Sequence, residues 1–296
     1  MVAGRLLLVD GMAVVYRAFY AIRGLTTAAG KPTNAVFGFI RMLGQLRDVW
    51  TPSHWAVVFD GGLSEEKIAL FREYKAQRPP MPDALREQLG AIETYLDLAE
   101  VCHWRQEGQE ADDVIASLAA AAPATMTDVL IATSDKDLCQ VVGPRTRLVP
   151  VSGKAPPTGS DGVAERTGVA PGQIVEWLAL VGDSVDNLPG VPGIGPKTAA
   201  RLLGEYGTLE RLWPRLHELD NAKVRHALQE NRELIARNMR MVRLREDLPC
   251  PVAWDSLKMR RPNPERLITF FEDLEFKAMA HELRQADLFS AMGGGV

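Results

Sequence analysis

The sequence is poor in cysteine and histidine. Its 296 residues include three cysteines and five histidines, and no two cysteines form a CxxC pair. Structural zinc sites need clustered Cys and His ligands, so the composition argues against such a site. Three scattered cysteines are typical of a reducing compartment and predict a cytoplasmic protein.

The sequence also lacks a long apolar run. No stretch of about 18 apolar residues is present, so we expect no membrane-spanning helix. The first residues, MVAGRLLLVD, contain no small-residue cleavage site and do not form a signal peptide. We expect a first strand there instead.

Positive charge is in slight deficit overall. The net charge of −4 argues, taken alone, against a nucleic-acid partner. Residues 197–245, however, contain eleven Lys and Arg against six Asp and Glu, so the rest of the chain is strongly acidic. This segregation predicts one acidic feature and one basic face.

Short apolar runs alternate with amphipathic stretches. Strands are expected at 5–9, 55–59, 129–132 and 146–151, and helices at about 33–50, 83–98 and 110–121. The alternation predicts an α/β fold with a mostly parallel, buried sheet.

The segment SGKAPPTGS, at 152–160, is rich in Pro, Gly and Ser and is a plausible boundary. We expect an α/β core at 1–158, a helical region at 159–250, C-terminal helices that pack back on the core at 251–289, and a flexible tail at 290–296.

Aspartates follow three of the expected strands. Asp10 ends LLLVD, Asp60 ends VVFD, and Asp135 and Asp137 follow VLIATS. Sites in open α/β sheets lie just outside the carboxyl ends of the strands. We therefore expect these four side chains to meet at one edge of the sheet.

Two further acidic groups lie at the start of a helix and in a turn. QEADDVIA places Glu110, Asp112 and Asp113 at the start of an alanine-rich helix, where acids also complement the helix dipole. Glu110 and Asp113 share a helix face and Asp112 points away, so the three could serve two neighbouring ions but not one. GDSVDN adds Asp183 and Asp186, for which a loop with Asx turns is the alternative.

These residues make a candidate metal site of nine carboxylates. They are Asp10, Asp60, Glu110, Asp112, Asp113, Asp135, Asp137, Asp183 and Asp186. If they converge, they cannot all stay ionised without cations. Oxygen ligands without His or Cys favour Mg²⁺, Mn²⁺ or Ca²⁺, and two Mg²⁺ ions about 3.5–4 Å apart are the usual apparatus for phosphodiester cleavage.

Six motifs carry a family resemblance. VDG, VVFD, YKAQR, QEADDVIA, TSDKDL and GDSVDNLPGVPGIGPKTA occur in this order. From about residue 4 to residue 285, the chain resembles the bacterial 5′-nucleases, which include the 5′-nuclease domain of DNA polymerase I and stand-alone flap endonucleases. With no polymerase domain following, it is more similar to the stand-alone type.

The resemblance implies a fold and an activity. The fold is a PIN-like core with a helical arch at about 64–108 and a helix–hairpin–helix DNA clamp. The activity is 5′-flap endonuclease and 5′→3′ exonuclease cleavage with Mg²⁺ or Mn²⁺, acting on 5′ flaps, nicks or free 5′ ends during replication and repair. A monomer associated with the nucleoid is expected.

The resemblance also divides the carboxylates between two ions. The first set is Asp10, Asp60, Glu110, Asp112 and Asp135, of which Asp135 is also counted as catalytic. The second set is Asp137, Asp183 and Asp186. Asp113 matches a shared or outer position.

FREYKAQRPP carries Arg72, Lys75 and Arg78 and, taken alone, reads as a solvated surface. The resemblance places it in the arch, where Lys75 and Arg78 would contact the scissile phosphate and stabilise transition-state charge. Arg72 is a further expected DNA contact. Tyr74 is expected either to stack on a base or to join the core. Arg17 is expected to contact a phosphate or to be a buried structural arginine.

LPGVPGIGPKTA, at 188–199, is a Gly/Pro turn that opens a helix. It resembles the family's clamp, which grips the duplex backbone without reading bases. The expected DNA contacts are Gly193, Gly195, Lys197, Thr198 and Arg201. The expected K⁺ ligands are the carbonyls of Val191 and Ile194 and the hydroxyl of Thr198.

KPTNAVFG, at 31–38, resembles the family's GxPTGAVYG segment beside the bend in the DNA, and Lys31 is an expected DNA contact. Two departures are Asn34 for Gly and Phe37 for Tyr, of which the second removes a hydroxyl.

QADLF, at 285–289, resembles the peptide by which bacterial replication proteins bind the sliding clamp. Leu288 and Phe289 would enter an apolar pocket while Gln285 forms hydrogen bonds at its entrance. The alternative is that they cap the last helix against the core.

Two other functions compete with a nuclease of this kind. One is a DNA-junction binder that keeps the fold without catalysis. The other, a ribonuclease of the small PIN type, is disfavoured because such domains lack the arch and the clamp.

Overall fold

Five parallel strands form the central sheet in a computed structural model that describes residues 4–249 and 253–293. They are β1 (Gly4–Asp10), β2 (His54–Phe59), β3 (His103–Arg105), β4 (Met126–Ala132) and β5 (Thr146–Val149). Their order across the sheet is β3-β2-β1-β4-β5, and every neighbouring pair is parallel. The predicted parallel α/β core is therefore confirmed, and the three-residue strand β3 is added to it.

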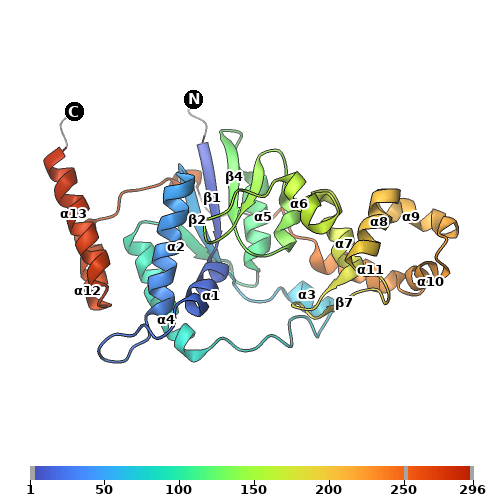
Figure 1. The fold of residues 1–296 in the computed structure, drawn as a ribbon, viewed down its shortest axis with the longest axis horizontal. Helices are drawn as coiled ribbons and strands as arrows, with labels where there is room; N and C mark the ends of the chain where they lie inside the picture. Colours follow the sequence, from blue (N-terminus) through green and yellow to red (C-terminus); the bar gives the residue numbers. More distant parts are fainter. Residues whose placement is uncertain (1–3, 250–252, 294–296) are drawn as a thin grey trace.

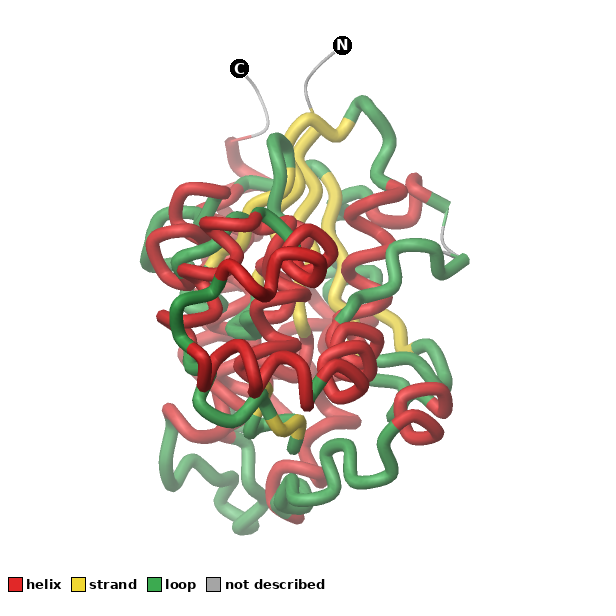
Figure 2. The backbone as a smooth tube through the Cα atoms, turned by 90° about the vertical axis from the view of Figure 1, so that its right-hand side faces the viewer, coloured by secondary structure: helices red, strands yellow, loops and turns green. Residues whose placement is uncertain are grey.

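Both faces of the sheet are covered by helices, as Figures 1 and 2 show. Leu7 and Val9 of β1 face a cluster that includes α1 (Gly11–Ala21), α2 (Asn34–Trp50) and α4 (Asp83–Leu98). Leu6 and Leu8 face the opposite cluster, which includes α5 (Ala111–Ala121). Successive side chains of a strand point to opposite faces, so burial on both sides explains the continuous apolar run LLLV.

A helical region extends to one side of the sheet (Figure 1). It contains α6 (Ser160–Thr167), α7 (Ile174–Val181), α8 (Pro196–Tyr206), α9 (Leu209–Leu212), α10 (Ala222–Glu230) and α11 (Arg232–Val242). A small hairpin of β6 (Gly182–Asp183) and β7 (Leu188–Pro189) interrupts the helices. The sequence predicted an almost wholly helical region and did not predict the hairpin, because strands of two residues leave no periodic pattern.

Gly182 makes this hairpin possible. Its φ of +77° lies in the left-handed region, and a Cβ there would approach the backbone nitrogen of Gly190 to 2.3 Å. Only glycine tolerates both conditions. The tight crossing sets the position of the acidic turn that follows, Asp183 to Asp186.

The C-terminal helices lie against the core helices. They are α12 (Pro264–Asp273) and α13 (Lys277–Gly293), and Phe271 and Phe276 belong to the same apolar cluster as α2 and α4. The ring of Phe37 meets Phe276 edge to face at 5.3 Å, so Phe37 is a packing residue here. Residues 290–293 of the predicted tail continue α13, whereas 294–296 lie outside the described residues.

Among the residues described, no helix combines the length and apolar character that crossing a membrane would require.

The start of α2 is held by a buried polar contact from α4. The side-chain oxygen of Gln88 accepts hydrogen bonds from the backbone nitrogens of Ala35 and Val36, at 2.8 and 3.3 Å. Gln88 also donates to the side-chain oxygen of Asn34, whose own nitrogen donates to the carbonyls of Phe19 and Ile22. Asn34, in place of the family glycine, therefore joins α1, α2 and α4.

Replacing Gln88 with leucine tests this contact. Gln88→Leu should lower the free energy of unfolding by about 1–3 kcal/mol, because buried N–H groups at the start of α2 lose their acceptor. Urea unfolding followed by circular dichroism measures the change. The exposed neighbour provides a control, since Glu87→Gln should leave stability unchanged. Equal stability of Gln88→Leu and the parent protein would contradict the contact's role.

Candidate active site

The carboxyl ends of β1, β2 and β4 deliver acidic side chains to one edge of the sheet. Asp10 ends β1 and caps α1, where its two oxygens accept hydrogen bonds from the Ala13 nitrogen and the Thr133 hydroxyl at 2.9 and 3.0 Å. Asp60 follows β2 and accepts from the Ala111 nitrogen at the start of α5, at 3.1 Å. The expected meeting of strand ends is thus observed.

The first turn of α5 points acids in two directions. Asp112 lies among the strand-end aspartates: Asp135, Asp10, Asp60 and Asp137 all act on it electrostatically. Asp113 is 1% exposed and faces elsewhere, since one oxygen accepts from the Arg245 nitrogen and the other from the Lys67 ammonium. The structure thus gives Asp113 two protein partners and leaves it a poor candidate for direct metal binding.

A second acidic group forms beside the first. Asp137, Asp183 and Asp186 each offer an oxygen, and the three oxygens lie within 4.8 Å of one another. Asp137 begins a short 3₁₀ helix, Asp137–Val141, and its nitrogen donates to Asp135 at 2.8 Å. The structure therefore brings seven of the nine predicted carboxylates together. Lys75 and Tyr74 join Glu110 to this group as its eighth member, and Asp113 stays outside it.

Burial and mutual repulsion perturb these acids. Burial raises the pKa of Asp10 to about 6, although hydrogen bonds from Ala13 and Thr133 oppose the shift. Burial together with the neighbouring Asp135 raises the pKa of both Asp112 and Asp137 well above the ordinary value. Burial also raises the pKa of Asp135. The cluster therefore resists carrying its full negative charge without added cations.

This donor set fits divalent ions. The ligand atoms are carboxylate oxygens from a single region, which suits hard cations. One oxygen of Asp137 is buried and has no hydrogen-bond partner, as expected of a group whose partner is an ion.

Three side chains of residues 71–80, the segment predicted to lie in an arch, cover the acidic edge. Lys75 contacts Glu110 at 2.5 Å, Arg78 contacts Asp186 at 2.6 Å, and the Tyr74 hydroxyl reaches both acids at 3.1 Å. Tyr74 is 3% exposed, so of its two expected roles the structure supports the core role and not base stacking.

The backbone of this segment is a series of turns, not a regular helix. Between α3 (Glu65–Leu70) and α4, residues 72–77 form turns, and Lys75 has a left-handed φ of +56°. The Lys75 nitrogen donates to the Asp186 carbonyl at 3.1 Å, and the Gln77 side chain donates to the Ser184 carbonyl at 2.8 Å. These bonds fix the turns on the acidic loop.

Two cations of the site were not expected from the sequence. Lys67 of α3 is 8% exposed and contacts Glu110 at 2.6 Å and Asp113 at 3.1 Å. Lys136 contacts Asp183 at 3.1 Å. In LSEEKIALF, apolar residues lie on both sides of Lys67. A lysine on the inner face of a short helix is the sequence signal that could have identified Lys67 as part of the site.

The predicted DNA contacts other than Lys75, whose side chain is 8% exposed, lie at the surface. Arg17, Lys31, Arg72, Gly193, Gly195, Lys197 and Arg201 are exposed, and Thr198 is partly exposed. Exposure of Arg17 removes its buried alternative. Lys197 lies at the start of α8, which Gly195 caps.

Val191 and Ile194 are buried, and the Ile194 nitrogen donates to the Val191 carbonyl at 3.0 Å. The carbonyl predicted to bind K⁺ thus already accepts one hydrogen bond, which leaves a second lone pair for an ion.

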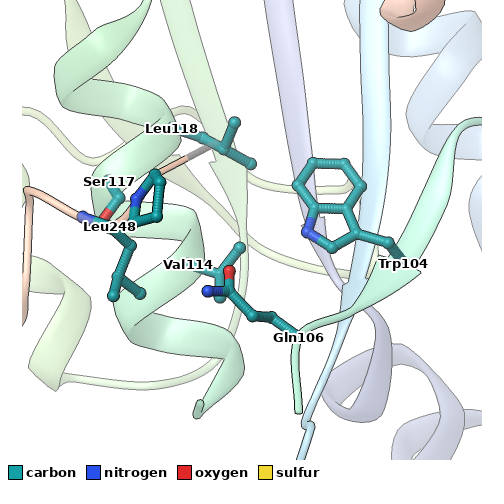
Figure 3. Close-up of a pocket in the computed structure, with 7 residues that line it drawn as sticks. Trp104, Gln106, Val114, Ser117, Leu118 and Leu248 are labelled. Carbon is teal, nitrogen blue, oxygen red and sulfur yellow. The ribbon is translucent and has the colours of Figure 1, made fainter. Parts of the chain in front are cut away.

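A crevice away from the acidic edge has a structural role (Figure 3). Trp104, Val114, Leu118 and Leu248 line it, and it has no room for a water molecule. The Ser117 hydroxyl donates to the Arg245 carbonyl and accepts from the Leu248 nitrogen. The crevice therefore seats the segment after α11 against α5.

The predicted clamp-binding peptide lies in α13. Gln285 is exposed, and its side chain contacts His281 at 3.0 Å. The side chains of Leu288 and Phe289 lie outside the described residues, so neither expected role of the peptide is decided.

Comparison with known proteins agrees with this site. The family model for the 5′-3′ exonuclease N-terminal resolvase-like domain matches residues 5–168, and that for the C-terminal SAM fold matches residues 169–265. The 5′-3′ exonuclease of Aquifex aeolicus is 37% identical over 279 residues, which cover 94% of each chain.

Longer relatives match over part of their length. DNA polymerase I of Pseudomonas aeruginosa is 43% identical over 292 residues, covering 94% of this chain and 31% of the polymerase. The chain thus spans about a third of that relative.

The fold is also found in a solved structure. A bacteriophage T5 flap endonuclease in complex with DNA and metal ions has a TM-score of 0.67 at 20% identity, covering 95% of this chain and 99% of that one. Because two family models together span most of the sequence and a relative of equal extent shares more than a third of its residues, the chain belongs to the 5′-3′ exonuclease family.

Proposed function

We propose that this protein is a 5′-flap endonuclease and 5′→3′ exonuclease that hydrolyses DNA phosphodiesters with two Mg²⁺ or Mn²⁺ ions. The observation that carries the proposal is the convergence of eight carboxylates from separate elements at one sheet edge, covered by Lys75 and Arg78. When bound, the ions would activate a water molecule and stabilise the charge on the leaving oxygen. Family membership supports replication and repair as the setting.

The carboxylates would hold two ions in the predicted division. Asp137, Asp183 and Asp186 supply the second set, in agreement with their proximity. Asp10, Asp60, Glu110, Asp112 and Asp135 supply the first. Asp113, in the first turn of α5, does not bind an ion in this proposal and supports the first set by holding Lys67.

Lys75 and Arg78 would bind the scissile phosphate. Both now pair with carboxylates that the ions require, so ion binding would release these two cations toward the substrate. Lys75 supplies a compact charge, whereas Arg78 can grip two phosphate oxygens at once. Their charge would stabilise the transition state after the 5′ end reaches the arch.

The helical region would grip the duplex. Gly193, Gly195, Lys197 and Arg201 are exposed around the start of α8, and Thr198 is partly exposed there, so they are available to a DNA backbone. Such contacts position a duplex without reading its sequence. A K⁺ ion bound by the carbonyls of Val191 and Ile194 and by Thr198 would bridge this turn to a phosphate.

Arg17, Lys31 and Arg72 would add phosphate contacts nearer the acidic edge and the arch. We also infer that Gln285, Leu288 and Phe289 bind the bacterial sliding clamp, on the strength of the QADLF pattern and the exposure of Gln285. The proposed enzyme acts as a cytoplasmic, nucleoid-associated monomer.

Removing one central carboxylate separates cleavage from binding. Asp135→Ala should lower cleavage of a 5′-labelled flap in Mg²⁺ by more than about a hundredfold, because even outer partners of a metal site cost 10–100-fold. Duplex affinity in EDTA should stay near that of the parent protein. Asp161→Ala, on exposed α6, is the control. Parent-like turnover by Asp135→Ala would defeat the assignment, and binding without Mg²⁺-dependent cleavage by the parent would favour a junction binder.

Two lysines should affect different steps. Lys75→Ala should lower the single-turnover rate more than it weakens DNA binding, because the charge acts on the transition state. Lys197→Ala should weaken binding and reduce the salt slope of the affinity by about one. Rapid-quench kinetics and fluorescence anisotropy at several salt concentrations measure the two effects. Lys154→Ala, in an exposed loop, should change neither, and identical defects in the two test variants would contradict the division of roles.

Stability should depend on pH when divalent ions are absent. The pKa of Asp10 is about 6 when folded, against an ordinary 3.8, so between these values the folded chain binds more protons than the unfolded chain. The free energy of unfolding in EDTA should therefore fall as pH rises from about 4 to about 6, and Asp112 and Asp137 should extend the fall upward. Mg²⁺ should offset it. Thermal melts in EDTA and in Mg²⁺ should diverge with rising pH, and a constant difference would refute the coupling.

A further inference from the structure

Lys67 is a buried cation for which catalysis as described above has no use. Its ammonium group lies between Glu110 Oε2, at 2.6 Å, and Asp113 Oδ2, at 3.1 Å. Burial alone would lower the pKa of Lys67, but the two carboxylates outweigh burial and raise it, so the side chain stays charged. α3 is thereby joined to the first turn of α5.

Lys67 and Lys75 hold opposite oxygens of Glu110. Lys75 contacts Oε1 and also lies 3.9 Å from Asp186, so both of its acidic partners belong to the carboxylate cluster. Lys67 contacts Oε2, and its other partner, Asp113, lies outside that cluster. Ions bound in the cluster would compete with Lys75 for its partners but would leave Asp113 to Lys67.

Asp113 is a fixed support for Lys67. Its second oxygen accepts a hydrogen bond from the Arg245 backbone nitrogen at 2.8 Å. The segment that contains Arg245 is held on α5 through Ser117 (Figure 3). The Lys67–Asp113 pair therefore keeps its place when charges in the cluster change.

We propose that Lys67 is a positioning residue, a permanent counter-ion that holds Glu110 Oε2 so that Oε1 stays directed at the metal ions when Lys75 leaves for the phosphate. This inference rests on the proposed function. Without Lys67, Lys75 would be the one cation of the described residues that still pairs with Glu110, and both ion binding at Oε1 and the release of Lys75 would become less favourable.

Three variants test the proposal. Lys67→Met keeps the length and removes the charge, and Lys67→Arg keeps the charge. Lys67→Met/Asp113→Asn restores the local charge balance without restoring the hold on Glu110. Glu66→Gln, which removes only the exposed pair with Arg240 from the same helix, is the control.

The first readout does not require activity. Free Mn²⁺ measured by electron paramagnetic resonance, without DNA, gives the ion affinity of each protein. Lys67→Met should bind Mn²⁺ roughly tenfold more weakly, and Lys67→Arg should remain within about threefold of the parent. The double variant should regain melting temperature in EDTA but not Mn²⁺ affinity.

The second readout is flap cleavage. Lys67→Met should lower kcat by at least roughly tenfold while KM and DNA affinity in EDTA change little, because the Lys67 side chain is buried and already pairs with Glu110 and Asp113. Parent-like Mn²⁺ affinity and kcat in Lys67→Met would overturn the proposal. Full recovery of both by the double variant would also overturn it, since Lys67 would then only balance charge for folding.

The two proposals can fail separately. Absence of Mg²⁺-dependent cleavage by the parent protein would reject the nuclease function, whereas the Mn²⁺ comparison would still test the hold of Lys67 on Glu110.

Discussion

Repulsion among buried carboxylates is the constraint on which the rest of this structure depends. Eight acidic side chains gather at one edge of the sheet, and burial together with repulsion from neighbouring acids raises the pKa of several of them, among them Asp10, Asp112 and Asp137. Lysine and arginine side chains of the protein neutralise part of this negative charge. The negative charge that remains favours the proposed binding of divalent cations. Without such ions, this charge would lower the stability of the folded protein.

The order of the strands in the sheet is what brings these carboxylates together. β2, β1 and β4 are neighbours, so Asp10, Asp60 and Asp135 leave the sheet side by side although they are far apart in sequence. The hairpin at Gly182 then brings Asp183 and Asp186 in from the helical region. Asp10, Asp112, Asp137 and Asp183 lie within helices or strands, and Asp60 and Glu110 directly adjoin one, so regular elements set most of the close spacing.

Residues 71–78 connect the acidic edge to the helical region. Tyr74, Lys75 and Arg78 bind the acidic edge, while Arg237 of α11 lies over the Phe71 ring at 4.3 Å. The same short segment thus touches the carboxylates and the helical region proposed to grip DNA. Substrate and ions would act on one set of contacts, which gives the two binding events a physical route for coupling.

The sequence by itself determined the parallel sheet, the acidic edge and the family, because apolar runs that end in aspartate identify strand ends and the motifs stand in a specific order. It also predicted that Glu110 and Asp113 share a helix face, which the shared contact with Lys67 agrees with. It could not place Lys67, assign Asp113 to a support, or decide that Tyr74 is buried. Helical periodicity states which side chains share a face but not which distant charge meets that face. Those pairings are made between α3, α5 and the Asp183–Asp186 turn, and only the packing of these elements determines them.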